Sequence, residues 1–258
     1  MAVGDIIGKP GRRALSYLLP DLRQKQNIDL VIANAENAAG GIGLTPQTAE
    51  DLLQSGVDVR TSGNHIWDKK DIIPYLDTHK YILRPLNYPP DLPGHGYVVK
   101  GETLIVNLIG RTFIGNFDCP FRAMDSLLEQ YKNKVKFVII DFHAEATSEK
   151  SALGRYLDGR VSAVLGTHTH VGTTDAGVLP RGTAYITDIG MTGPKDSIIG
   201  DDIDSVLDRF LTLMPHRLSV GKGNVICNYV ILELDETTGM ARSIKHYSTE
   251  VDHQILSG

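Results

Sequence analysis

The sequence predicts an α/β protein built from two mixed sheets with helices on the outside. Up to Asn64, apolar runs alternate with helical patterns, which is typical of parallel strands joined by crossover helices. Later stretches read as antiparallel hairpins, so mixed rather than purely parallel sheets are expected. Several of the apolar runs also end in polar residues of metal-ligating types.

The chain opens with a short apolar stretch that ends at Asp5. Residues 1–3 are fewer than the about five residues of a typical strand, so either this strand is truncated or translation starts upstream. The intact mass of the native protein distinguishes these alternatives. Residues 11–26 carry leucines at helical spacing, and residues 30–33 form a continuous apolar run typical of a buried parallel strand.

A glycine-rich loop at residues 40–43 leads to the second helical segment. Thr45 suits the N-cap of this helix and Pro46 its first turn, and the helix is expected to end near Gly56. The next apolar run, residues 57–61, closes on Asn64 and His65.

The second half of the chain mixes both kinds of strand pairing. Prolines make residues 84–96 a loop, and a hairpin is expected after it. The predicted strands are residues 97–100, 103–109, 137–142, 161–165, 184–187, 225–234 and 242–247, and the predicted helices are residues 124–131 and 147–157. No repeat, low-complexity tract or linker divides the chain, so residues 1–258 are expected to form a single domain.

Composition indicates a cytoplasmic, water-soluble protein. The chain has 258 residues, 41% of them hydrophobic and 22% charged, which is ordinary for a globular protein. A net charge of -5 argues against a broad basic face for duplex nucleic acid. Cys119 and Cys227 lie far apart, which favours a reducing compartment, and no apolar run is long enough to span a membrane.

Polar side chains at the ends of the predicted strands suggest a metal site. The six residues are Asp5, Glu36, Asn64, His143, His168 and His170. Strand ends on one edge of a parallel sheet converge, and carboxylate, amide and imidazole groups together suit two borderline divalent metals. His168 and His170 are two residues apart, so an extended segment places both on the same side, although such a pair alone is a weak signal.

Five blocks of sequence carry a resemblance to a known family. The blocks are residues 4–8, 34–39, 63–68, 141–147 and 187–194. In this order and spacing they resemble the YmdB family of calcineurin-like metallophosphoesterases, from Asp5 nearly to the C-terminus. The resemblance implies a four-layer α/β/β/α sandwich and assembly into homo-oligomers.

The resemblance also implies an activity. Members are dinuclear metallophosphodiesterases that act on small cyclic nucleotides, notably 2′,3′-cyclic ones, through attack by a hydroxide that bridges the metals. Two metals about 3.5–4 Å apart can lower the pKa of a bridging water and hold both phosphoryl oxygens.

The ligand set implied by the resemblance departs from the broader superfamily in two positions. Ile7 stands where a histidine ligand is usual, and Glu36 replaces the usual bridging aspartate. The resemblance implies that Asn37 supplies the ligand that Ile7 cannot. The resulting assignment places Asp5, Glu36, Asn37 and His170 on one metal, and Glu36, Asn64, His143 and His168 on the other. The two ions, divalent or trivalent, are manganese, iron or zinc, and the sequence does not choose between them.

His65 is the predicted catalytic residue, a general acid for the departing ribose oxygen, with a purely hydrogen-bonding role as the alternative. Asp68 is a possible orienting group that the sequence leaves unassigned. Asp188 either holds a ligand histidine or caps a turn.

Two other functions stay open. The same site could serve a phosphomonoesterase or a phosphatase of RNA ends, which hydrolysis of a simple monoester would reveal. A regulatory protein that senses a nucleotide without turnover would carry a damaged ligand set, and none is visible.

Overall fold

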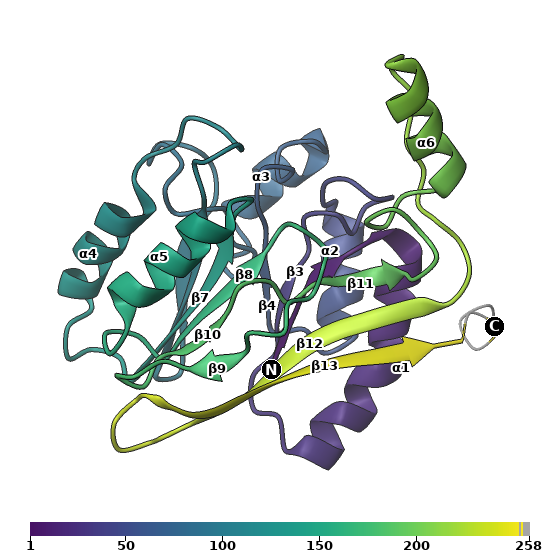
Figure 1. Cartoon of the computed structure of the whole chain (residues 1–258). Coiled ribbons are helices and arrows are strands. Elements are labelled where there is room, and N and C mark those ends of the chain that lie inside the picture. The colour runs from purple at the N-terminus through teal and green to yellow at the C-terminus, as the bar shows by residue number, and fades with distance from the viewer. Residues whose placement is uncertain (253, 255–258) are drawn as a thin grey trace.

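The fold is seen in a computed structural model that describes residues 1–252 and 254 (Figure 1). The predicted domain extends over residues 1–258, so residues 253 and 255–258 of that prediction lie outside the described part. Two mixed sheets carry helices on their outer faces, as predicted.

The first sheet has the order β2-β11-β12-β1-β3-β4, with β13 paired to β12. Its strands are β1 (Ala2–Val3), β2 (Asp5–Ile6), β3 (Ile32–Asn34), β4 (Val59–Thr61), β11 (Met191–Pro194), β12 (Val225–Leu234) and β13 (Ala241–Val251). Strands β1, β3 and β4 are parallel, whereas β12 runs antiparallel to β1, β11 and β13. The late strand β12 therefore joins the two halves of a sheet that begins at the N-terminus.

The second sheet has the order β5-β6-β7-β8-β10-β9. Its strands are β5 (Tyr97–Lys100), β6 (Thr103–Ile109), β7 (Phe137–His143), β8 (Ala163–Thr167), β9 (Gly177–Val178) and β10 (Ala184–Ile186). Strands β6, β7, β8 and β10 are parallel, and the two edge strands are antiparallel to them. The predicted hairpin of β5 and β6 is therefore confirmed.

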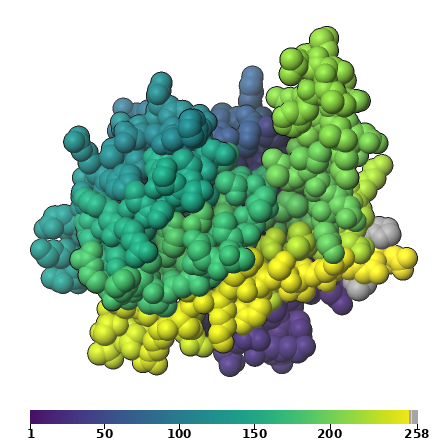
Figure 2. All heavy atoms as spheres, viewed as in Figure 1, coloured from purple at the N-terminus to yellow at the C-terminus, as the bar shows by residue number. Residues whose placement is uncertain are grey.

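Helices cover the outer face of each sheet. The helices of the described chain are α1 (Gly8–Gln26), α2 (Pro46–Gln54), the 3-10 turn η1 (Lys70–Ile72), α3 (Ile73–Leu76), α4 (Pro120–Gln130), α5 (Thr147–Leu157) and α6 (Ile203–Thr212), and α1, α2, α4 and α5 pack on the sheets. One apolar cluster joins α1 and α2 to the first sheet, and another joins α4 and α5 to the second. Helix α6 stands apart as an arm (Figures 1 and 2).

A third apolar cluster lies between the two sheets. Ile32 and Val59 of the first sheet pack with Ile105, Ile139 and Leu165 of the second. Each fully buried side chain of this size stabilises the fold by about 1.5–3 kcal/mol. The cluster fixes the two sheets face to face, so residues at the strand ends of one sheet lie beside those of the other.

Local sequence signals explain where several helices begin and end. Thr45 caps α2 by accepting the Thr48 N–H, and the Thr48 hydroxyl accepts the Thr45 N–H in return. Asn27 ends α1 in the left-handed conformation with φ 49°. Helix α4 begins at Pro120, before the predicted residue 124, because proline suits the first helical position. Among the described residues, no helix is long and apolar enough to cross a membrane.

Candidate metal centre

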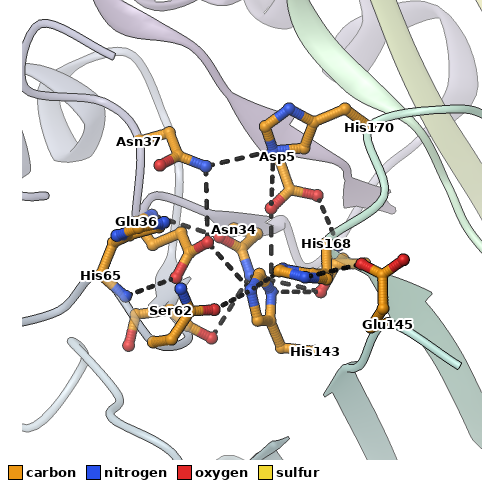
Figure 3. A network of polar contacts seen from close by, with 12 residues as sticks. Asp5, Asn34, Glu36, Asn37, Ser62, His65, His143, Glu145, His168 and His170 are labelled. Carbon is orange, nitrogen blue, oxygen red and sulfur yellow. Dashed lines mark hydrogen bonds and ion pairs between the residues drawn. The ribbon is translucent and has the colours of Figure 1, made fainter. Parts of the chain in front are cut away.

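Ends of strands from both sheets meet at one cluster of polar side chains (Figure 3). The first sheet contributes Asp5 in β2, Glu36 and Asn37 after β3, and Asn64 after β4. The second sheet contributes His143 at the end of β7 and His168 and His170 after β8. The structure thus brings together all seven side chains that the sequence selects as metal ligands.

His143 lies at the centre of one part of the cluster. Its Nε2 is 2.9 Å from Glu36 Oε1, 3.2 Å from Asn64 Oδ1 and 2.9 Å from His168 Nδ1. Ligand atoms of Glu36, His143 and His168 all lie within 4.8 Å of one another. This grouping matches one of the two ligand sets expected from the sequence.

Asp5, Asn37 and His170 form the other part of the cluster. His170 Nε2 is 3.8 Å from Asp5 Oδ1 and 3.2 Å from Asn37 Nδ2. Asn37 Nδ2 is also 3.4 Å from Glu36 Oε1. Glu36 therefore contacts both parts of the cluster.

The cluster has one carboxylate oxygen that the protein itself does not satisfy. Asp5 is fully buried, and its Oδ1 has no hydrogen-bond partner among the described residues. A buried carboxylate oxygen without a partner is costly, and a cation removes that cost. Three imidazoles, two carboxylates and two amide side chains are also the donors that first-row transition metals accept, so the residues fit metal ions.

The electrostatics of the cluster follow from burial and close contact. Burial disfavours the charged forms of Glu36 and His143, but their mutual attraction outweighs it, so the pKa of Glu36 falls to about 2 and that of His143 rises to about 9. Burial together with the positive charge of His143 lowers the pKa of His168 to about 3. His168 is therefore neutral at pH 7, whereas His143 must lose a proton before it can coordinate a cation.

The loop after β8 holds its two histidines in strained conformations. His168 and His170 have backbone φ values of 102° and 65°, which residues other than glycine rarely adopt. Asp188 Oδ2 accepts the Thr169 N–H at 3.1 Å and the Lys150 ammonium at 2.6 Å. Asp188 thus fastens the backbone between the two histidines and contacts neither ring. Its Oδ1 also accepts the Gly190 N–H at 2.8 Å, so of the two roles expected from the sequence the turn cap is the one observed.

The backbone of Gly63 lies directly against two side chains of the cluster. A Cβ at this position would lie 2.1 Å from His143 Cδ2 and 2.5 Å from Glu36 Oε2. Only glycine leaves room for the imidazole and the carboxylate to pack against this backbone.

A buried polar network beneath the cluster was not predicted. Asp141 Oδ1 accepts the Thr167 hydroxyl at 2.7 Å, and its Oδ2 accepts the Thr61 hydroxyl and the Asn34 amide. The Thr167 hydroxyl lies 3.0 Å from His143 Nδ1. This network orients the His143 ring, so that Nε2 faces the ligand cluster. In the sequence, the signal that could have indicated this network is the presence of polar residues inside otherwise apolar runs.

His65 lies at the edge of the cluster with part of its side chain exposed. Its backbone N–H donates to Glu36 Oε2 at 3.1 Å, and its Nδ1 is 2.6 Å from Asp68 Oδ2. Asp68 therefore orients the imidazole and leaves Nε2 available. The spacing of three residues between His65 and Asp68 was the only sequence signal for this pair.

A cleft of about 670 Å³ opens above the cluster. Its lining includes His65, His168 and His170, together with Glu145, whose Oε2 is 3.0 Å from His168 Nε2. The volume falls within the about 300–1,000 Å³ typical of small-molecule sites.

Two mixed sheets packed face to face, with histidines, carboxylates and amides where their strands end, define the metallophosphoesterase class of α/β fold. A Staphylococcus aureus structure provisionally titled as a 5′-nucleotidase covers 95% of this chain and 52% of its own, with a TM-score of 0.57 and 14% identity. At that identity the likeness shows the fold alone.

The YmdB-like protein family matches residues 1–247, so this chain belongs to that family. The resemblance seen in the sequence is thereby confirmed, and the family implies divalent metal ions.

Similar proteins cover nearly the whole chain. A Bacillus subtilis (strain 168) protein named 2′,3′-cyclic-nucleotide 2′-phosphodiesterase is 46% identical over 258 residues, 98% of each chain. A hypothetical protein from Thermus thermophilus has a TM-score of 0.90 and 47% identity, over 96% of this chain and 98% of its own. A structure titled as a novel phosphatase from Mycoplasma pneumoniae has a TM-score of 0.90 and 33% identity, and the match covers 100% of this chain and 95% of the other.

Proposed function

We propose that this protein is a metal-dependent phosphodiesterase that opens 2′,3′-cyclic nucleotides to nucleoside monophosphates. The observation that carries the proposal is the cluster of three histidines, two carboxylates and two amides, in which the buried Asp5 Oδ1 has no hydrogen-bond partner among the described residues. The name of the Bacillus subtilis relative, at 46% identity, supports the substrate class.

Two metal ions are proposed, held by the two parts of the cluster. Asp5, Asn37 and His170 would hold one ion, and Asn64, His143 and His168 the other. Glu36 would contact both, since it already lies 2.9 Å from His143 and 3.4 Å from Asn37. When bound, such ions activate a water molecule and neutralise the phosphate oxygens.

The chain's own residues supply the proton transfer. Hydrolysis consumes one water: a new P–O bond forms to the water oxygen, one P–O bond to ribose breaks, and the freed ribose oxygen takes a proton. His65 donates this proton from Nε2, because Nδ1 is engaged with Asp68 at 2.6 Å.

A phosphomonoesterase is the second candidate, because a similar structure from Mycoplasma pneumoniae is titled as a phosphatase. A regulatory protein without turnover has less support, since six of the seven expected ligands lie together in Figure 3 and the seventh, Asn64, lies 3.2 Å from His143.

Parallel assays distinguish these functions. Protein purified without chelators is analysed for manganese, iron and zinc, and then given 2′,3′-cyclic AMP or p-nitrophenyl phosphate. We expect hydrolysis of the cyclic nucleotide to exceed that of the monoester, and chelation to abolish it. A faster monoester reaction favours the phosphatase, and binding without product favours the regulatory protein. His143→Gln serves as the control variant without metal.

Cytoplasmic location and homo-oligomer formation stay predictions. Support for self-association comes from α6, where Ile203, Leu207 and Leu211 recur every four residues and are 42%, 45% and 81% exposed. Sedimentation velocity measures the oligomeric state directly.

A further inference from the structure

The cleft above the cluster continues onto the arm formed by α6 and the segment after it. Arg209, His216 and Arg217 line its outer wall, and all three are exposed. Within residues 1–252 and 254, none of these three side chains forms a hydrogen bond or an ion pair, and Arg209 has an electrostatic contact with Asp201. The outer wall thus presents two guanidinium groups that the described part of the protein leaves available for a ligand.

A second hollow of about 650 Å³ lies next to the cleft and is mainly apolar. It shares Ile199, Asp201, Arg209 and Leu218 with the cleft, so the two spaces lie side by side. Phe210, on the same helix as Arg209, lines this hollow and is 74% exposed. A path along the lining therefore runs from the metal cluster to Arg209 and Arg217, and on to Phe210, the next residue of α6 after Arg209.

We propose that the substrate is the 3′ end of an RNA strand that carries a terminal 2′,3′-cyclic phosphate. This inference rests on the proposed phosphodiesterase function. In it, Arg209 and Arg217 bind the phosphate one nucleotide upstream, and Phe210 stacks on the adjoining base.

The chemistry of the path favours a strand end over a free cyclic mononucleotide. A cyclic mononucleotide has a single phosphate, which the metal cluster takes, so Arg209 and Arg217 would have no anion to bind. An RNA end supplies a second phosphate and a second base along the same path. Stacking on an aromatic ring tolerates any base, so no sequence preference is expected from Phe210.

Charge limits the interaction to the last few nucleotides. The chain carries a net charge of -5, and among the described residues the other charged side chains that line the cleft are Lys69, Glu36, Glu145 and Asp201. Long nucleic acid would be repelled, whereas a strand end meets the arginines locally. The reaction is the same ring opening: water adds to phosphorus, one ribose P–O bond breaks, and that ribose oxygen takes a proton.

Two substrates and four variants test the inference. Uridine 2′,3′-cyclic phosphate is compared with a uridine trinucleotide that ends in the same cyclic phosphate. For the unmodified protein we expect a KM about tenfold lower for the trinucleotide. Arg209→Gln and Arg217→Gln should each raise the trinucleotide KM about threefold to tenfold. Phe210→Ser should raise it similarly, and in each variant the change in the mononucleotide KM should be smaller.

Arg122→Gln on α4 is the matched control, because Arg122 lies outside the cleft lining. Fluorescence anisotropy of a trinucleotide with a 3′ phosphate gives a second readout that needs no turnover. The slope of its salt dependence should fall by about 0.7 for each phosphate that a variant no longer binds.

The outcomes separate the two proposals. Hydrolysis of the mononucleotide with equal KM for both substrates overturns the RNA-end inference and leaves the phosphodiesterase standing. Failure to hydrolyse either substrate overturns the phosphodiesterase. If Phe210→Ser changes the sedimentation coefficient and leaves the trinucleotide KM unaltered, a second copy of the chain covers this ring, and the stacking role is wrong.

Discussion

The surroundings of His143 restrain both nitrogens of its imidazole ring. It is fully buried, its Nδ1 contacts the Thr167 hydroxyl, and its Nε2 contacts Glu36, Asn64 and His168. A ring fixed on both nitrogens has a single orientation, which is what a metal ligand needs. The cost of burying its charge is offset by Glu36, and coordination of a cation would replace that proton.

His65→Ala should lower the turnover of a cyclic nucleotide about a hundredfold or more, because the leaving ribose oxygen then lacks its proton donor. Metal content should stay unchanged, since His65 contacts the cluster mainly through its backbone N–H. Steady-state kinetics and elemental analysis measure these effects. Bis(p-nitrophenyl) phosphate, whose leaving group needs no proton, is the control substrate. Equal losses on both substrates would show that His65 does not protonate the leaving group.

Gly63→Ala should reduce metal content, because the new methyl group would meet His143 Cδ2 at 2.1 Å and Glu36 Oε2 at 2.5 Å. Elemental analysis after purification measures the loss. Gly177→Ala is the matched control, since its Cβ would meet no atom closer than 3.8 Å. Full metal occupancy in Gly63→Ala contradicts the role given to this glycine.

The sequence could predict the ligands but not the residues that support them. Asp5, His143 and His168 end apolar runs, and that position is readable from the chain itself. The hydrogen bond from Thr167 to Asp141 crosses between neighbouring strands, so strand order must be known first. Arg209 joins the cleft lining only through the tertiary placement of the arm, which no local pattern reveals.

The strands and helices of the core were predicted well, and the arm was not. Helix α5 was predicted with its observed bounds, because an apolar face and flanking strands define it. Helix α6 escaped prediction although Asp202 caps it by accepting the Ser205 N–H. Its apolar residues mostly face outward, so they do not connect it to a neighbouring strand or helix. Strand β11 is short and was missed because its pairing with β2 and β12 is non-local.

The buried ion pair between α5 and the segment after β10 should be important for stability. Lys150→Met should lower the free energy of unfolding by about 3–5 kcal/mol, because Asp188 is left charged and buried. Urea denaturation measures the change.

Two further variants control for this effect. Lys150→Met/Asp188→Asn should recover part of the loss, since the isolated charge is gone. Lys195→Met breaks an exposed pair with Glu250 and should leave the urea midpoint nearly unchanged. If Lys150→Met behaves like Lys195→Met, the buried pair contributes little to stability.

The cluster spans both sheets, so metal ions would tie together the two halves of the molecule. One sheet supplies the carboxylates and amides, and the other supplies the three imidazoles. Since the apolar cluster between the sheets and the polar cluster at their edge share the same strands, we propose that the chain unfolds as a single domain.

Removal of metal should lower the melting temperature by about 10 °C, because a ligand at a thousandfold excess over its Kd adds about 4 kcal/mol. Differential scanning calorimetry with and without chelator measures the shift. One transition is expected in both samples. Two separate transitions, of which the chelator moves only one, would contradict the single domain.

The position of β12 has a consequence for how the protein is made in the cell. Strand β2, which carries Asp5, pairs with β11, and only β12 links that pair to β1 within the described part of the chain. A ribosome must therefore have translated past residue 234, and released that stretch from its exit tunnel, before β2 and β1 belong to one hydrogen-bonded sheet. In an unfinished nascent polypeptide this sheet therefore stays in two pieces, and its pairing is completed only near the close of synthesis.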